Sequence, residues 1–93
     1  MREQKQANSE VDFIIPFRQY VIPLEVKAGK AGTLRSLHQF MEMADHPYAV
    51  RLYAGPLQIT EASTPQGKTF RLLNLPYFLA GKIYDYLDWF MLQ

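Results

Sequence analysis

The sequence of 93 residues contains no cysteine and no long apolar run. The lack of cysteine excludes disulfide bridges, thiolate zinc sites and cysteine nucleophiles, and it fits a cytoplasmic protein. No apolar stretch approaches the ~18 residues that a membrane-spanning helix needs. The polar start, residues 1–9, lacks the apolar core of a signal peptide. We therefore expect a cytoplasmic protein that does not contact a membrane.

An excess of charge of one sign is also absent. Ten Lys and Arg residues against nine Asp and Glu residues leave a net charge of +1, so no bulk electrostatic attraction to nucleic acid is expected. The chain has no internal repeats, and its length suits one hydrophobic core rather than two. We expect the polar segment 1–9 to precede a single domain that spans residues 10–93.

Short β-branched and aromatic runs alternate with two helical patterns. The expected elements are strands at 11–15 and 20–28, a helix at 33–45, strands at 48–53, 57–60 and 69–73, and a helix at 76–91. The first connection is short enough for an antiparallel hairpin. The helix between the second and third strands makes those strands parallel, with a right-handed connection. The sequence therefore predicts an α/β fold, a small mixed sheet in the order β-β-α-β-(β)-(β)-α with helices packed on it.

The final predicted helix, 76–91, is apolar or aromatic on nearly every side. One stripe consists of Leu79, Ile83, Leu87 and Phe90, and further apolar or aromatic residues lie elsewhere on it, namely Tyr77, Tyr84, Trp89 and Met91. A helix with this pattern usually buries more than one face. We therefore expect either a core role or an interface for self-association or for another domain.

Two charged residues interrupt the apolar run Val21–Lys27. Alternation along a strand places Glu25 and Lys27 side by side on one face, and a hairpin brings Asp12 opposite residues 23–25. Two carboxylates from adjacent strands suit Mg²⁺, and a neighbouring lysine can activate water or stabilise a pentacoordinate phosphate. The same residues also suit a plain cross-strand ion network worth about 1 kcal/mol or less. Spacing alone leaves both interpretations open.

Four segments together resemble a known family: Ser9–Phe13, Ile22–Gly29, Leu34–Phe40 and Leu73–Pro76. They are similar to the C-terminal domain of a large bacterial and archaeal family of AAA-type ATPases, which itself resembles the PD-(D/E)XK, or restriction-endonuclease-like, nucleases. The resemblance covers residues 7–80. It implies that the single domain 10–93 has a restriction-endonuclease-like fold.

The resemblance also implies a function. Asp12 would match the first metal-binding aspartate, Glu25 the acidic residue of the E-x-K element, and Lys27 its lysine. The implied cofactor is Mg²⁺ and the implied partner is DNA, which would be bound or cleaved. The Gly/Lys cluster 28–32 lacks the pattern of a phosphate loop, so we expect an isolated domain without an ATPase core. The alternatives are a non-catalytic assembly or regulatory domain, docking an ATPase domain or itself through helix 76–91, and a dimeric remnant without activity.

Other polar residues near the predicted site have weaker signals. Lys30 and Arg35 flank the Gly-rich break and are candidate phosphate contacts, with solvated surface as the alternative. Gln39, on the following helix, is a candidate polar helper, as in some related nucleases. His38 and His46 do not have the spacing of a metal site, and no metal role is expected for them.

Overall fold

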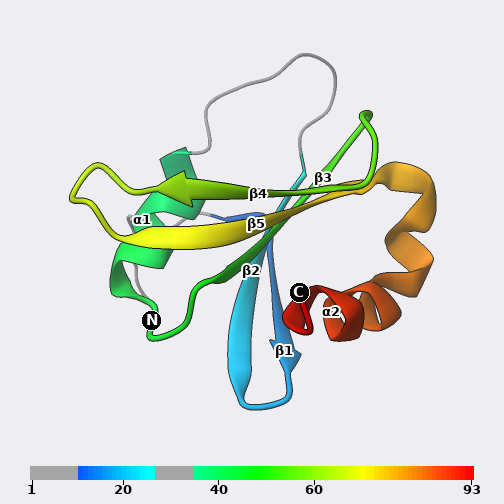
Figure 1. Cartoon of the computed structure of the whole chain (residues 1–93), viewed down its shortest axis with the longest axis horizontal. Coiled ribbons are helices and arrows are strands. Elements are labelled where there is room, and N and C mark those ends of the chain that lie inside the picture. Colours follow the sequence, from blue (N-terminus) through cyan, green and yellow to red (C-terminus); the bar gives the residue numbers. More distant parts are fainter. Residues whose placement is uncertain (1–10, 27–34) are drawn as a thin grey trace.

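The fold is organised around a five-stranded mixed sheet with the strand order β1-β2-β3-β5-β4 (Figure 1). The computed structural model describes residues 11–26 and 35–93. Its elements are β1 (Phe13–Phe17), β2 (Tyr20–Val26), α1 (Arg35–Met43), β3 (Tyr48–Tyr53), β4 (Gln58–Ser63), β5 (Thr69–Pro76), the 3-10 helix η2 (Tyr77–Lys82) and α2 (Ile83–Met91). The segment 1–9 and the candidate residues Lys27 and Lys30 lie outside the described ranges.

The three central strands, β2, β3 and β5, are parallel, and the two edge strands pair antiparallel to their neighbours. The predicted α/β fold with a mixed sheet is confirmed, as are the first hairpin and the parallel pairing of β2 with β3 across α1. Because the central strands are parallel, their carboxyl ends lie at the same end of the sheet. Ligands of open α/β sheets bind at such ends.

The two helices cover opposite faces of the sheet, since their cores use alternate residues of the same strands. α1 packs Leu37 and Met41 against one face, on Ala49, Phe70 and Leu72. α2 packs on the other face, where the buried residues are Ile22, Leu24, Val50, Leu52, Leu73, Leu75, Leu87 and Phe90. In Figure 1, α1 lies at the left and the η2–α2 segment, orange to red, at the right. No helix within the described ranges is long and apolar enough to cross a bilayer.

The first hairpin turns later than predicted. β1 continues through Pro16 and Phe17, and the turn consists of Arg18 and Gln19 rather than residues 16–19. Proline is tolerated there because β1 is an edge strand, where one side of the backbone needs no partner. Arg18 has a φ of 57°, a region that residues other than glycine seldom adopt. The unfavourable backbone conformation that this tight turn requires is therefore adopted by Arg18.

The last part of the chain also differs from the prediction. The predicted helix start at residue 76 is wrong, because Asn74, Leu75 and Pro76 continue β5 and pair with β3. The chain then forms η2, and the α-helix begins only at Ile83. Sheet pairing thus outweighs the helix-starting preference of proline. The predicted apolar stripe is confirmed, since all four of its residues contribute to the α2-side core.

Three further boundaries shift by a few residues. α1 ends at Met43 instead of residue 45, β4 runs over Gln58–Ser63 instead of 57–60, and β5 extends three residues past its predicted end. β4 is longer because all six of its residues find partners on β5. Such shifts follow from tertiary pairing, which local sequence patterns do not contain.

Candidate functional site

A row of polar residues crosses the sheet near the carboxyl ends of its parallel strands, on the face that α1 covers. The strand register places Glu25 of β2 beside Arg51 of β3, and Arg51 beside Asn74 of β5. Both polar side chains are buried, Glu25 with 8% exposed and Asn74 fully. Burying polar groups costs free energy unless they find hydrogen-bond or charge partners. We call Glu25, Arg51 and Asn74 the polar row.

Asn74 holds Arg51 in place. Its Oδ1 accepts a hydrogen bond of 2.8 Å from Arg51 Nε. Its Nδ2 has three acceptors within 3.3 Å, the carbonyls of Gln58 and Leu72 and the hydroxyl of Thr60. The buried amide is therefore satisfied on both sides, and its orientation is fixed by β4 and β5 together.

A second contact holds the other side of the Arg51 guanidinium. The group lies over the ring of Tyr53, 4.6 Å from the ring centroid, which is a cation–π arrangement. The Tyr53 hydroxyl donates a 2.7 Å hydrogen bond to the carbonyl of Pro56. A Cβ atom added at Gly55 would come within 2.8 Å of the Tyr53 ring and hydroxyl. The absence of a side chain at Gly55 therefore allows the Tyr53 ring to pack closely against this residue while the Arg51 guanidinium lies over the ring.

Asp12 lies at the Glu25 end of the polar row. The pairing of β1 with β2 ends with Phe13 opposite Leu24, and Asp12 and Glu25 are the next residues along the two segments. Asp12 Oδ2 accepts a 2.8 Å hydrogen bond from the backbone N–H of Val26. The exposed carboxylate thus replaces the strand partner that β1 no longer supplies, and it is held on the residue that follows Glu25.

The donor set of this corner suits a hard divalent cation. Two carboxylates on adjacent strands are oxygen ligands that Mg²⁺ accepts together with water and phosphate. Within the described part of the chain, the hydrogen bond of the Asp12 carboxylate is made by Oδ2 and not by Oδ1. The described residues contain no group of three or more His, Asp or Glu side chains arranged for a metal. Two carboxylates are therefore what this corner offers, and Lys27 lies outside the described ranges.

The structure does not bring the other candidates into contact with these carboxylates. Arg35 is exposed at the first residue of α1, and Gln39 is half-buried one turn later. Neither forms a hydrogen bond with Asp12 or Glu25. Leu37 and Met41 face the sheet. Gln39 is two residues from each of them, which is about 200° around the helix, so it lies on the side turned away from the sheet. The candidate Lys30 lies outside the described residues.

Sequence reasoning missed Arg51 and Asn74 as members of this site. Each carries a recognisable signal: Arg51 is the charged residue of the run Tyr48–Tyr53, and Asn74 is the amide in the apolar run Leu72–Pro76. A polar residue inside an otherwise apolar strand needs a partner. Only the register shows that these two residues are partners of one another.

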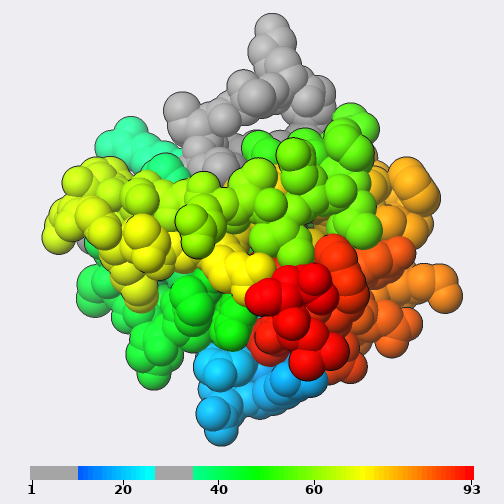
Figure 2. All heavy atoms as spheres, in the orientation of Figure 1, coloured from blue at the N-terminus to red at the C-terminus, as the bar shows by residue number. Residues whose placement is uncertain are grey.

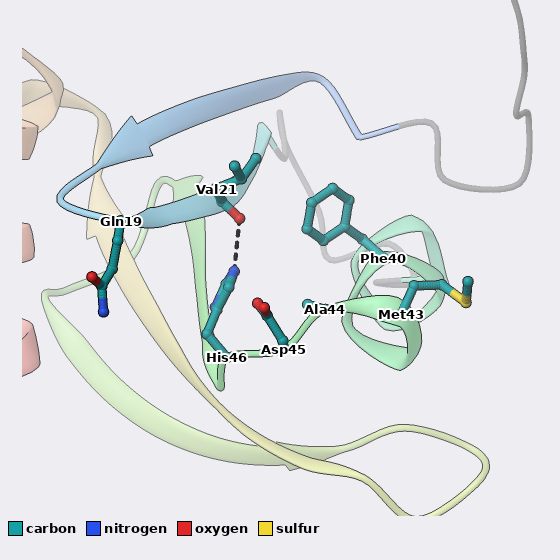
Figure 3. Close-up of a pocket in the computed structure, with 7 residues that line it drawn as sticks. All are labelled: Gln19, Val21, Phe40, Met43, Ala44, Asp45 and His46. Carbon is teal, nitrogen blue, oxygen red and sulfur yellow. Dashed lines mark hydrogen bonds between the residues drawn. The ribbon is translucent and has the colours of Figure 1, made fainter.

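His46 joins the end of α1 to the sheet, at the opposite end from the polar row. Figure 3 shows its ring directed at the Val21 carbonyl. The Tyr48 N–H donates to Nδ1 at 3.1 Å, so Nε2 carries the proton and donates to Val21 at 2.7 Å. The β2–β3 ladder starts only at Leu24, after Pro23, and the histidine satisfies a β2 carbonyl before that point.

A shallow hollow of about 360 Å³ lies beside this histidine. It lies between the first hairpin and the C-terminal end of α1 (Figure 3). Its lining residues are Gln19, Val21, Phe40, Met43, Ala44, Asp45 and His46. None of the residues predicted for catalysis lines it. The polar row and this hollow are therefore separate features.

The fold and the polar row define a mixed α/β domain with an acidic and basic cluster at the carboxyl ends of parallel strands. The chain belongs to the family described as Domain of unknown function (DUF4143), whose model matches residues 2–78. This domain is commonly found in proteins associated with AAA-type ATPases. No curated protein and no solved structure matches the chain. The likeness to the PD-(D/E)XK nucleases therefore stays a prediction from the sequence.

Proposed function

We propose that this domain is a nuclease-like module that binds DNA and acts on its phosphodiester backbone with the help of Mg²⁺. The observation that supports the proposal is the hydrogen bond that holds the Asp12 carboxylate on the backbone N–H of Val26, the residue after Glu25, near the carboxyl end of β2. That end is where ligands of open α/β sheets bind. The family's common occurrence beside AAA-type ATPases is compatible with an accessory role of this kind.

In this proposal Asp12 and Glu25 hold the cation. Bound Mg²⁺ supplies Lewis acidity and offsets the charge that develops on phosphate. The Val26 N–H keeps the Asp12 carboxylate turned toward β2, so little reorganisation is needed on binding. The role proposed for Lys27, two residues after Glu25 in the sequence, is to accept or donate the proton of the attacking water, or to neutralise the phosphate.

Isosteric variants test this site. Asp12→Asn keeps an oxygen acceptor for the Val26 N–H while removing the charge, and Glu25→Gln keeps the volume of a buried side chain. Each should abolish the chemical shift changes that Mg²⁺ or Mn²⁺ causes in the amides of residues 12 and 25. Each should also lower plasmid nicking by about 100-fold or more, since a Lewis acid supplies several kcal/mol.

Matched controls make this experiment decisive. Glu61→Gln removes a carboxylate from an exposed position of β4 and should leave metal shifts and nicking unchanged. Lys27→Ala should lower nicking but leave the metal shifts at residues 12 and 25 in place. If millimolar metal produces no shift in the wild-type protein, or if all variants nick equally, the catalytic proposal is wrong.

A second candidate is an assembly domain that docks through η2 and α2. The observation that favours it is the exposure of large aromatic side chains on this segment: Phe78 is 85% exposed, Tyr84 56% and Trp89 39%. The nuclease-like module and the assembly domain depend on different residues. Docking does not require Asp12 or Glu25, so Asp12→Asn and Glu25→Gln leave it intact.

A further inference from the structure

The Arg51 guanidinium is held at one edge and over one face by described residues of the sheet. Nε is bound to the buried Asn74 amide, and the plane of the group rests on Tyr53. The terminal nitrogens Nη1 and Nη2 make no hydrogen bond or ion pair within the described part of the chain. The side chain is half-buried, so it reaches solvent. Among the described residues, these two nitrogens, which carry four N–H groups, therefore have no acceptor.

We propose that Arg51 binds a phosphate group of a DNA backbone. The fork of an arginine matches a phosphate with two parallel hydrogen bonds. Because Asn74 and Tyr53 already fix the side chain, little rotamer freedom is lost when the anion binds. The inference rests on the proposed function in one respect, since that function names DNA as the source of the phosphate.

The position of Arg51 agrees with this role. It is the strand neighbour of Glu25, so a phosphate held by Arg51 lies next to the carboxylates. Two carboxylates repel a phosphate, and a guanidinium beside them offsets that repulsion. The fully buried Asn74 has a purpose in this arrangement, because its Oδ1 binds the Nε–H and so fixes the orientation of the guanidinium.

The test measures DNA binding by the full chain in EDTA, so that divalent metal plays no part. Arg51→Gln should weaken binding of a duplex oligonucleotide about tenfold. It should also lower the slope of log affinity against log salt by about 0.9, the value for one phosphate contact. Arg51→Lys keeps the charge, so the slope should remain while the affinity falls several-fold.

Arg71→Gln is the matched control. Arg71 is another half-buried arginine of the central sheet, with an aromatic ring, Phe90, below it and a bond from Nη1 to the Gln93 carbonyl. It lies on the α2 face, away from the polar row. Its variant should leave affinity and salt slope unchanged. Equal effects of Arg51→Gln and Arg71→Gln would overturn the proposal.

A measurement on the wild-type protein avoids reliance on variants that fold poorly. The side-chain NMR signals of Arg51 should shift on titration with the oligonucleotide, while those of Arg71 stay in place. Shifts with inorganic phosphate but not with DNA would support the anion site and assign it to small phosphates. No Arg51 shift with either ligand would refute it.

The two proposals can fail separately. DNA binding that depends on Arg51 without any metal shift at residues 12 and 25 supports the phosphate site and contradicts the nuclease. Metal-dependent nicking that survives in Arg51→Gln at full rate, with unchanged DNA affinity, supports the nuclease and contradicts the phosphate site.

Discussion

At the scale of single residues, two polar side chains, His46 and Asp12, lie where the sheet ladder is incomplete. His46 satisfies a β2 carbonyl and a β3 N–H, and Asp12 satisfies a β2 N–H beyond the end of β1. Both contacts replace hydrogen bonds that a longer strand would make. A buried backbone group that loses its partner costs about 1–3 kcal/mol. These two side chains therefore stabilise the sheet by satisfying backbone groups that have no strand partner.

His46→Ala should lower the free energy of unfolding by about 2–4 kcal/mol, because two backbone groups lose their partner at a position that is 5% exposed. Urea unfolding followed by circular dichroism measures this loss. The control Asp45→Ala, at the exposed neighbouring residue, should change stability by less than about 0.5 kcal/mol. Equal stability of the two variants would show that the histidine bridge does not stabilise the fold.

At the scale of elements, the turn after β3 determines how Arg51 is held. Tyr53 ends the strand, bonds to Pro56 and supports the guanidinium. The close approach of the Tyr53 ring to Gly55 leaves no room for a side chain there. The conformation of this turn therefore determines the position of the Tyr53 ring, and the ring in turn supports Arg51 of the polar row.

Gly55→Ala should move the Tyr53 ring and destabilise the protein by about 1–3 kcal/mol, as expected for a small-to-large change without room. Gly81→Ala is its control, since a Cβ there has no heavy atom within 4 Å. That change should be neutral or stabilising by up to about 1 kcal/mol. Thermal unfolding of both variants provides the comparison, and an unaffected Gly55→Ala would contradict the packing described for Tyr53.

At the scale of the whole molecule, the two helices cover opposite faces, and the α2 side keeps an aromatic exterior. In Figure 2, the α2 segment (red) lies next to the blue end of the first hairpin. An ion pair between Arg18 and Asp88 joins these two elements. Both side chains are about half exposed, so the pair contributes about 1 kcal/mol or less. Phe17 stacks on Tyr84 at the same junction.

If η2 and α2 form an interface, the isolated chain should self-associate, because docking surfaces expose apolar area that a partner covers. Sedimentation velocity should then show a mass that rises with concentration. Phe78→Ser should shift the equilibrium toward the monomer without lowering thermal stability, since this side chain is 85% exposed. Met43→Ser, at a residue 84% exposed on α1, should have no effect. A monomer at every concentration would count against self-association through this segment.

Local patterns in the sequence were enough to predict most of the elements and the topology. The apolar stripe of the last helix predicted the face that packs on the sheet, because apolar residues that recur at helical spacing lie on one side of a helix. Tyr84 and Trp89 are exposed in the single chain, so the expectation that this helix buries a second face against a partner stays a prediction. Aromatic composition does not show whether a partner covers a residue.

The sequence by itself determined the α/β class, the first hairpin and the parallel crossover, because these depend on residue types and spacing along one or two strands, and it singled out Asp12 and Glu25 as candidate site residues. Only the tertiary structure decided that Arg51 and Asn74 join this pair. They come from different strands, and the register between β2, β3 and β5 is set by the packing of two cores. A shift of one residue in that register would send every side chain to the other face. The polar row therefore exists only once the sheet is assembled.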